Sequence, residues 1–217
     1  MFSQLSVNRQ KIKNPGIYFM VKRLMDIILS LSSIILLIPL FIIIGILIKR
    51  DSKGPVIFKQ ERYGKNKEPF YIYKFRTMRL DAPNDVSTEE LKDSKNYITK
   101  IGGFLRRTSL DELPQLFNIL LGQMTVVGPR PVVLKEKNLI ALRDIYGANN
   151  IKPGITGWAQ INGRDLLSVE EKAKLDGYYV ENMGFKMDIN CFFKTIQYVL
   201  KCEGILEGGE EVDINHI

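Results

Sequence analysis

The sequence has little of the residue types that most often bind metal ions or form disulfides. Its 217 residues include only two cysteines, Cys191 and Cys202, and one histidine, His216. The two cysteines lie 11 positions apart (202 − 191), which fits neither a metal-ligand pair nor a disulfide framework. We therefore expect a reducing compartment and no chemistry that depends on histidine.

The common nucleotide-binding and nucleic-acid-binding motifs are also absent. The sequence contains no Walker lysine motif, no strand-linked dinucleotide fingerprint, no helix-turn-helix, no zinc site and no aromatic platform. A net charge of +7 with a pI near 9.3 still predicts an anionic partner. Nucleic acid, a phosphorylated ligand and an anionic bilayer all fit this charge, and only the bilayer has independent support in the sequence. We therefore expect a membrane partner and no nucleic acid.

That support is a run of 22 residues without a charge, from Ile27 to Ile48. It is long enough to cross a bilayer as a helix. It exceeds a usual signal-peptide core, and Lys49 and Arg50 stand where a small-residue cleavage site would be expected. We therefore expect the segment to stay in the mature protein.

Two features favour a re-entrant helix over a spanning one. Lys22 and Arg23 precede the apolar run, and Lys49 and Arg50 follow it. Because positively charged flanks of a membrane segment tend to stay in the cytoplasm, both ends of the run are expected on that side. Pro39, near the middle, removes a backbone donor and kinks the helix. Prolines are tolerated in spanning helices, so the spanning alternative stays open at this point.

Two short strands are predicted after the apolar run. Residues 54–60 and 70–78 are rich in aromatic and β-branched side chains, and a turn over residues 64–69 separates them. Alternation along the second strand places Lys74 and Arg76 on one face. These cations are either ordinary solvated charges of a hairpin or part of a binding site.

Helices are predicted from apolar periodicity and from their stop signals. The helix predicted at residues 185–201 is expected either to pack on the core or to lie along a membrane surface. Residues 81–96 are polar and acidic and predict a surface loop. The predicted helices cover residues 88–92, 116–121, 132–147, 169–175 and 185–201.

The densest cluster of charged residues is an acid pair. Asp111 and Glu112 follow Arg106 and Arg107 and come directly before a helix-forming run. Adjacent carboxylates beside two arginines indicate phosphate chemistry near a bound cation. A purely structural helix cap explains the same residues equally well on spacing alone.

Two placements of that cap are open. Ser109 and Glu112 match a capping box, but Pro114 would then be the fifth helical residue, where its missing N–H and its ring are costly. With Asp111 at the N-cap, Pro114 falls in the first turn, where no intrahelical donor is needed. The second placement is the one we expect.

Two further segments supply polar groups. Arg130 lies between two prolines in residues 126–131, and a guanidinium fixed in this way suits phosphate recognition. Residues 152–164 hold closely spaced glycines together with Gln160 and Arg164. Glycine-rich turns are most often only turns, but these glycines allow a close approach of the backbone to a ligand.

Several of these motifs occur together and in a fixed order. The chain resembles the bacterial sugar transferases called monotopic phosphoglycosyl transferases over residues 20–203. It departs from the family pattern at Ile38, where many members have serine, and at Gln123, Thr125 and Asp165. The shared motifs are Lys22-Arg23-Leu-Met-Asp26, the proline-interrupted apolar run, Tyr73-Lys-Phe-Arg-Thr-Met78, Leu105-Arg-Arg-Thr-Ser-Leu-Asp-Glu-Leu-Pro-Gln115, Val127-Gly-Pro-Arg-Pro131 and Pro153-Gly-Ile-Thr-Gly-Trp-Ala-Gln160.

The resemblance implies a mainly helical α+β fold with a small β-hairpin and amphipathic helices at the membrane surface. The expected organisation is a cytoplasmic segment (1–21), a proline-kinked re-entrant helix (22–48), a cytoplasmic catalytic domain (49–204) and an acidic tail (205–217). The expected location is the bacterial inner membrane, with the catalytic domain on the cytoplasmic face.

The resemblance also implies the chemistry. The family transfers a phosphosugar from a UDP-sugar to polyprenyl (undecaprenyl) phosphate and releases UMP, which starts a lipid-linked glycan for downstream glycosyltransferases. Asp111 would be the nucleophile that forms an aspartyl-phosphosugar intermediate, and Glu112 would bind Mg²⁺. The motifs specify neither the sugar nor the oligomeric state. A non-catalytic membrane scaffold and a conventional, UDP-releasing glycosyltransferase are the alternatives.

The other site residues implied by the resemblance fall into two groups. The arginines expected to stabilise phosphate charge are Arg106, Arg107, Arg130 and Arg164. The weaker candidates are Lys74, Arg76, Gln160, Asp176 and Tyr179.

Overall fold

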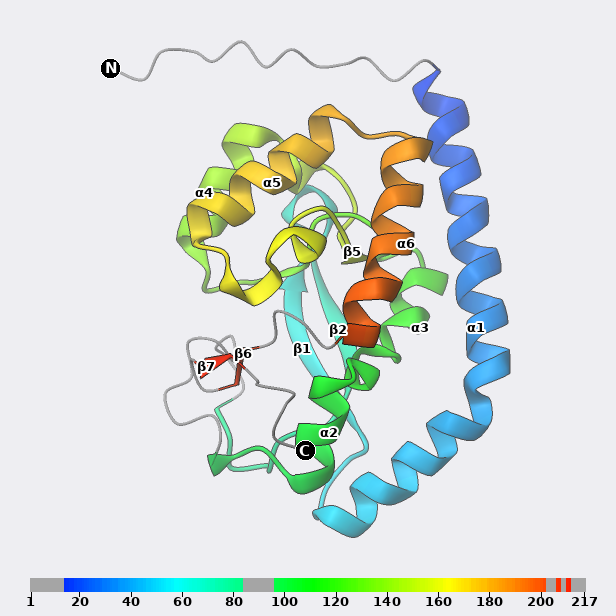
Figure 1. Cartoon of the computed structure of the whole chain (residues 1–217), viewed down its shortest axis with the longest axis vertical. Helices are drawn as coiled ribbons and strands as arrows, with labels where there is room; N and C mark the ends of the chain where they lie inside the picture. The colour runs from blue at the N-terminus through cyan, green and yellow to red at the C-terminus, as the bar shows by residue number, and fades with distance from the viewer. Residues whose placement is uncertain (1–13, 84–95, 202–205, 208–209, 212–217) are drawn as a thin grey trace.

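The computed structural model describes residues 14–83, 96–201, 206–207 and 210–211, and it shows a mainly helical α+β chain (Figure 1). One long helix runs along the side of a compact body built from the remaining helices and small sheets. The helices are α1 (Pro15–Asp51), α2 (Lys100–Arg107), α3 (Gln115–Leu120), α4 (Lys137–Tyr146), α5 (Val169–Glu181) and α6 (Phe185–Lys201). The strands are β1 (Ile57–Tyr63), β2 (Pro69–Phe75), β3 (Thr125–Val127), β4 (Val132–Val133), β5 (Gly154–Thr156), β6 (Leu206–Glu207) and β7 (Glu210–Glu211).

Helix α1 is continuous over 37 residues and begins earlier than the predicted residue 22. Pro15 stands at its start, where a missing N–H costs nothing. Pro39 lies inside the helix, and the ribbon of α1 changes direction in its C-terminal part (Figure 1). A proline that removes one backbone hydrogen bond and crowds the preceding turn accounts for such a bend.

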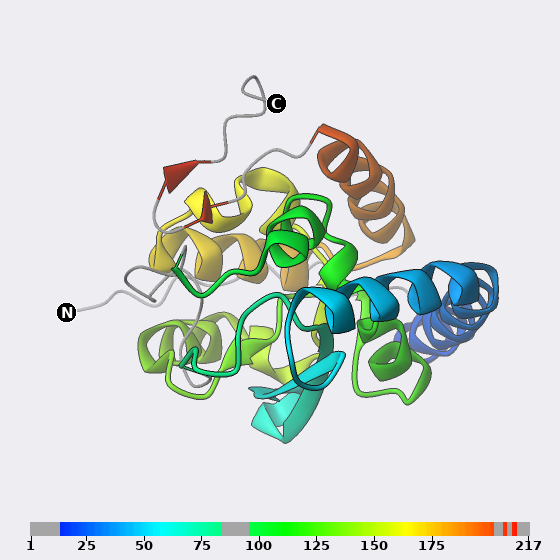
Figure 2. The same ribbon diagram turned by 90° about the horizontal axis from the view of Figure 1, so that it is seen from below.

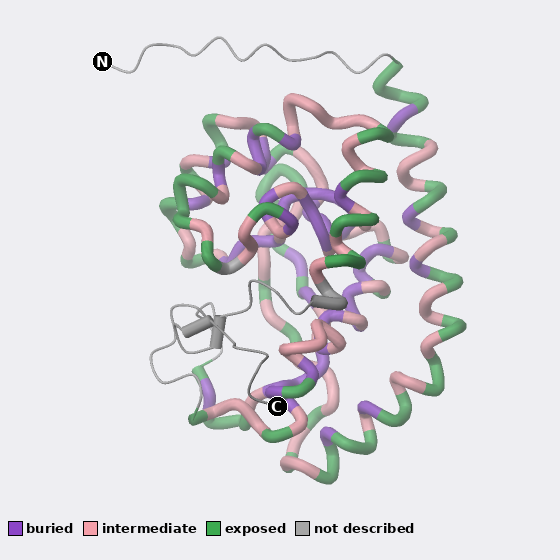
Figure 3. The backbone as a smooth tube through the Cα atoms, in the orientation of Figure 1, coloured by how far each residue is buried: buried purple, intermediate pink, exposed green. Residues whose placement is uncertain are grey.

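Most of the apolar surface of α1 faces outward. The helix is long and apolar enough to cross a membrane, and only 11% of its most apolar stretch is buried. Figure 3 shows exposed residues along most of its length. An exposed apolar surface of this extent marks a site of contact with a membrane or with another protein. Helix α1 therefore supports the assignment of this chain as a membrane protein.

The N-terminal half of α1 is joined to the body by charged side chains. Arg23 donates to two carbonyl oxygens in the last turn of α3, at 2.6 and 2.8 Å. Asp26 is buried and accepts a 2.9 Å hydrogen bond from the backbone N–H of Val126 in β3. Lys22 lies 2.6 Å from Asp188 of α6. The Lys-Arg-x-x-Asp motif thus holds α1 against three elements of the body.

The C-terminal half of α1 packs through apolar residues instead. Ile44 and Ile48 are buried in a cluster with Phe75 of β2 and Leu105 of α2. Burying side chains of this size contributes roughly 1.5–3 kcal/mol each. Seen from below, α1 and α6 lie on one side of the body, and α4 and α5 lie on the other (Figure 2).

The predicted hairpin is confirmed. β1 and β2 pair antiparallel with Phe58 opposite Lys74, and β4 adds to the other edge of β1 with Val133 opposite Arg62. β3 and β5 form a separate parallel pair. This pairing places the segment with Arg130, between β3 and β4, next to the glycine-rich segment that contains β5.

One predicted helix is partly wrong. Residues 132–147 were expected to be helical throughout, but Val132 and Val133 form β4 and the helix begins only at Lys137. Both valines are buried, and β-branched side chains favour a strand when a neighbouring edge is free to pair. Pairing with β1 therefore overrides the helical periodicity at the start of this segment.

The two C-terminal helices are confirmed. α5 extends beyond the predicted residue 175 to Glu181, and Ser168 and Glu171 form a capping box at its start. α6 has the predicted bounds, Phe185–Lys201. The predicted helix at residues 88–92, most of the surface loop at 81–96 and most of the acidic tail lie outside the described residues.

Candidate active site

The acid pair lies on a single 3-10 turn between α2 and α3. This turn, η3, covers Leu110–Glu112 and follows Ser109, whose φ of 55° is in the left-handed region. The hydroxyl of Ser109 makes no capping hydrogen bond to the turn. The capping-box alternative is therefore wrong.

The placement of Asp111 at the helix N-cap is also wrong. α3 begins at Gln115, and Pro114 occupies the N-cap position. Because proline has no N–H to donate, the chain closes a tight turn before it and starts the α-helix after it. The acid pair is thus carried by a rigid bend and not by the first turn of α3.

The carboxylate of Glu112 binds two cations from different elements. Lys74 of β2 places its Nζ 2.8 Å from Oε1 of Glu112, and Arg130 places its Nη2 2.8 Å from the same oxygen. Asp111 and Glu112 are each 8% exposed. Charge-assisted hydrogen bonds in a mostly buried place are stronger than surface pairs, so Glu112 organises the two cations around the pair.

The environment shifts the pKa values of the two acids in opposite directions. Burial raises the pKa of Asp111 above its ordinary value, against the lowering effect of Lys74. Burial also acts to raise the pKa of Glu112, but Arg130 and Lys74 outweigh it and hold that pKa well below its usual range. Neighbouring carboxylates with separated pKa values are typical of sites where the two acids have different roles.

Arg130 is itself held in place from behind. Arg143 of α4 donates from Nη1 to the carbonyl oxygen of Arg130 at 2.8 Å, and from Nε to Asp176 of α5 at 2.7 Å. Arg143 and Asp176 are both buried. Asp176 therefore supports the backbone that carries Arg130. It lines neither of the two cavities that are described next.

Asp111 opens onto a cavity of about 440 Å³ on one side of the pair. We call it the basic groove, because Asp111 is its single carboxylate and the other charged residues that line it are all cations. It lies between β1, β2 and the end of α2. Its charged lining residues are Lys59, Arg62, Lys74, Arg76, Arg79, Arg106 and Asp111.

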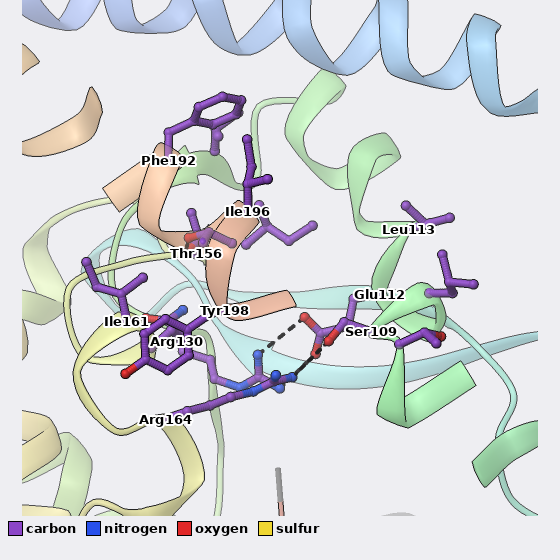
Figure 4. A pocket seen from close by; sticks show the side chains of 16 residues that line it. Ser109, Glu112, Leu113, Arg130, Thr156, Ile161, Arg164, Phe192, Ile196 and Tyr198 are labelled. Atoms are coloured by element: carbon purple, nitrogen blue, oxygen red, sulfur yellow. Dashed lines mark hydrogen bonds and ion pairs between the residues drawn. The ribbon is translucent and has the colours of Figure 1, made fainter. Parts of the chain in front are cut away.

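Glu112 opens onto a different cavity, of about 360 Å³, which we call the amphiphilic pocket. Arg130 and Arg164 reach toward Glu112 at one end of it (Figure 4). Leu113 and the α6 residues Phe192 and Ile196 line the part that faces α1 (Figure 4).

The structure brings most of the predicted site residues together. Lys74 and Arg106 line the basic groove with Asp111, and Arg130, Gln160 and Arg164 line the amphiphilic pocket with Glu112. Their individual roles stay predictions.

Four predicted residues have other places. The guanidinium of Arg76 donates to the carbonyl oxygens of Ser52 and Lys53, so it holds the end of α1 although part of it lines the groove. Asp176 pairs with Arg143, as described above. The hydroxyl of Tyr179 lies 2.7 Å from Asp188. The polar groups of these three residues thus form hydrogen bonds within the fold. The fourth residue, Arg107, lines neither of the two cavities.

Some residues that line the two cavities are not among those predicted from the sequence. Gln60 and Arg62 lie on the partly buried face of β1, and Arg62 donates to Gln60 at 2.6 Å. Alternation along β1 was the available signal, since these two positions share a face. Phe192 and Ile196 carry no such signal, because their helical spacing is equally typical of core packing.

Two strained residues meet at the amphiphilic pocket. Ser109 and Arg164 have φ values of 55° and 50°, which non-glycine residues seldom adopt. Arg164 donates from Nη2 to Oγ of Ser109 at 3.2 Å. Strain of this kind persists when the surroundings fix it, and it is found often at ligand sites.

The acid pair fits a magnesium ion only with help from a substrate. In the part of the chain that the structure describes, no group of three or more acidic, histidine or cysteine side chains converges. Mg²⁺ is commonly bound through one or two carboxylates together with substrate phosphates and waters. Glu112 and Asp111 meet that requirement once phosphate oxygens are present.

Comparison with known proteins gives a consistent result. The family model described as "Bacterial sugar transferase" matches residues 17–202. A UDP-glucose:undecaprenyl-phosphate glucose-1-phosphate transferase of Klebsiella pneumoniae is 42% identical over 188 residues, 83% of this chain and 40% of that protein. An exopolysaccharide production protein of Rhizobium leguminosarum is 40% identical over 186 residues, 81% of this chain and 93% of that protein.

The lengths of the relatives differ. The chain spans 40% of the K. pneumoniae protein and 40% of a similarly named protein of Escherichia coli, which is 39% identical. It spans 90% of an uncharacterized sugar transferase of Bacillus subtilis that is 40% identical. The acid pair, the cations around it and most of α1 all fall inside residues 17–202, which the family model matches.

Proposed function

Because the chain belongs to the bacterial sugar transferase family, we propose that it transfers a phosphosugar from a UDP-sugar to polyprenyl phosphate, as relatives with undecaprenyl-phosphate transferase names do. The reaction releases UMP and leaves a polyprenyl-diphosphate sugar. One observation carries the proposal: a mostly buried carboxylate pair lies between two cation-lined cavities, beside a helix apolar enough for a membrane. A phosphorylated donor and a lipid acceptor both need such surroundings.

The first step uses Asp111 as the nucleophile. A carboxylate oxygen of Asp111 forms a bond to the β-phosphorus of the UDP-sugar, and the bond from that phosphorus to the bridging oxygen of UMP breaks. UMP leaves with the electron pair, and the sugar phosphate stays on Asp111. Lys74 and Arg106, which line the same groove, stabilise the charge that develops on the phosphate oxygens.

The second step returns the enzyme to its starting state. A phosphate oxygen of the polyprenyl phosphate attacks the phosphorus held on Asp111, and the bond from that phosphorus to the carboxylate oxygen breaks. Asp111 leaves as a carboxylate, and the new P–O–P linkage joins sugar and lipid. No proton transfer is needed, which agrees with a site where no histidine is found among the described residues.

Magnesium has a defined place in this proposal. Glu112 would hold it, with the neighbouring Asp111 as a second carboxylate, and substrate phosphate oxygens would be its further ligands. When bound, the ion offsets the repulsion between an anionic nucleophile and an anionic diphosphate. Lys74 and Arg130 already hold Glu112 in its ionised form, which is the form that binds a divalent cation.

The membrane arrangement follows from the two substrates. The donor is water-soluble and the acceptor is anchored by an isoprenoid, so the reaction must occur at the level of the headgroups. We propose that α1 enters and leaves one leaflet of the bacterial inner membrane, with the catalytic body on the cytoplasmic face. The lipid product would then pass to downstream glycosyltransferases that extend an exopolysaccharide, a capsule, an O-antigen or a glycoprotein glycan.

The test is an assay of the purified protein with a panel of UDP-sugars and undecaprenyl phosphate. We expect UMP and lipid product in equal amounts with one or a few sugars, dependence on Mg²⁺, and no turnover by Asp111→Asn. Release of UDP would instead show a conventional glycosyltransferase. Absence of any nucleotide release, with Asp111→Asn still supporting glycan assembly in cells, would show a scaffold.

A further inference from the structure

The acidic side chains of the pair face different cavities. Asp111 lines the basic groove and Glu112 lines the amphiphilic pocket, and neither residue lines both. Lys74 lies on the groove side and Arg130 on the pocket side, although both bind Glu112. The pair therefore separates two spaces that differ in character.

The polar end of the amphiphilic pocket is built for an anion. Arg130 and Arg164 both reach toward it, and Arg164 is oriented by Ser109 at 3.2 Å. The amide of Gln160 also lines the pocket, and its side-chain oxygen and nitrogen are buried without a hydrogen-bond partner among the described residues. Buried amide groups are nearly always satisfied in native proteins, so this amide is available to a bound ligand.

The other end of the pocket is apolar and leads toward the membrane helix. Phe192 and Ile196 of α6 line it on the side of α1 (Figure 4). Leu113 lines it as well, and the same side chain packs into the cluster with Leu40 and Phe41 of α1. An apolar ligand in this pocket therefore has a continuous apolar path to α1.

The basic groove differs from the pocket mainly in its charge. Six cations line it together with Asp111, among them Lys59, Arg62 and Arg106, beside apolar residues such as Phe58 and Leu80. It lies along the hairpin of β1 and β2, and none of the described residues of α1 or α6 lines it, although Ile57 and Phe75 belong to the cluster that packs on α1. Its six cations suit a diphosphate better than the amphiphilic pocket does, where Arg130 and Arg164 are the cations that line it.

We propose that the two substrates use opposite sides of the acid pair. The amphiphilic pocket binds the phosphate and the first isoprene units of the polyprenyl phosphate, and the UDP-sugar enters through the basic groove. Arg130 and Arg164 bind the lipid phosphate, and Leu113, Phe192 and Ile196 contact the hydrocarbon. The pocket is far too small for a whole polyprenyl chain, so the remainder runs along α1 into the bilayer. This inference rests on the proposed function.

The test uses two isoleucines of the same helix as a matched pair. Ile196 and Ile189 are both exposed on α6, at 44% and 56%, but only Ile196 lines the pocket. Each is changed to serine in the full chain, reconstituted in nanodiscs, and kcat/KM is measured separately for undecaprenyl phosphate and for the UDP-sugar. In a two-step mechanism each of these constants reports only the half-reaction of its own substrate.

We expect Ile196→Ser to lower kcat/KM for undecaprenyl phosphate by roughly 10-fold or more, because the bound hydrocarbon would cover this half-exposed isoleucine. kcat/KM for the UDP-sugar should stay within about 2-fold of the wild-type value. Ile189→Ser should leave both constants near their wild-type values, which separates the pocket from general membrane attachment. Lys59→Ala, in the basic groove, should show the reverse pattern.

Three outcomes would overturn the inference. Equal losses in Ile196→Ser and Ile189→Ser would mean that α6 acts only through membrane attachment. A loss in kcat/KM for the UDP-sugar with Ile196→Ser would place the donor in the amphiphilic pocket. Full activity of Ile196→Ser toward undecaprenyl phosphate would exclude contact with the lipid. If the wild-type protein releases no UMP with any donor, the proposed function fails, and the inference fails with it.

Discussion

Lys74 and Arg130 bind the same oxygen atom of Glu112, each at 2.8 Å, although they line different cavities. Among the described residues, Glu112 is thereby the carboxylate that touches a cation from each side of the site. Removing its charge would leave Lys74 mostly buried without its partner and would release Arg130 from its position. The pair of cations and the acid should therefore act as one unit.

The first prediction concerns this unit. Glu112→Gln keeps the shape of the side chain but removes the charge that holds Lys74 and Arg130 and that, in our proposal, would bind a magnesium ion. We expect kcat/KM for the UDP-sugar to fall by at least ~10²–10³-fold, the range seen when one preorganised electrostatic group is lost. The measurement is UMP release. Glu61→Gln, an exposed position on β1, is the control and should keep wild-type activity; equal effects in both variants would contradict the assignment.

The second prediction concerns pH. Because burial raises the pKa of Asp111, the nucleophile takes up a proton at a higher pH than an ordinary aspartate does. kcat/KM for the UDP-sugar should therefore fall as pH is lowered through this raised pKa. Lys74 acts to lower the pKa of Asp111, so Lys74→Met should move the acid limb of the profile to higher pH. A shift of the limb to lower pH in Lys74→Met would contradict this electrostatic arrangement.

The third prediction concerns stability. Asp176 and Arg143 form a buried pair, and removing one partner leaves the other charge buried alone. Asp176→Asn should lower the free energy of unfolding by roughly 3–5 kcal/mol, measured by denaturant unfolding in detergent micelles. Asp81→Asn breaks an exposed pair with Arg79 and should cost only about 0–1 kcal/mol. Similar small costs in both variants would mean that Asp176 is not structural.

The fourth prediction concerns the topology of α1. If the helix is re-entrant, its two ends lie on the same side of the membrane. Single cysteines at Ile17 and at Lys53, introduced into a chain without its native cysteines, should both react with an impermeant thiol reagent in inverted vesicles. Neither should react in intact spheroplasts. Labelling of Ile17→Cys from the outside of spheroplasts would establish a spanning helix.

Much of the fold could be predicted from the sequence, because several elements carry a strong local signal. The bounds of α6 follow from apolar residues at helical spacing, and the hairpin follows from two β-rich runs around a turn. β4 could not be predicted in the same way. Its two valines become a strand only because the edge of β1 lies beside them, which is a long-range contact.

The site was predicted in part, for a similar reason. The acid pair, Lys74 and Arg130 were identified by residue type and position, and the structure brings them together. The ion pair of Asp176 with Arg143 could not be predicted, because a charged residue gives no sign, in sequence, of a buried partner 33 positions away. Phe192 and Ile196 were not assigned to the site because an amphipathic helix has the same pattern whether it meets a core, a membrane or a ligand.

The central claim is the covalent step at Asp111, and mass spectrometry of the peptides from the digested protein tests it most directly. The protein is incubated with its UDP-sugar and Mg²⁺ in the absence of polyprenyl phosphate, then digested. We predict a mass increase equal to one sugar phosphate, located on the peptide that contains Asp111, which disappears when undecaprenyl phosphate is added. No adduct under these conditions, with UMP released only when both substrates are present, would contradict the claim and indicate direct transfer.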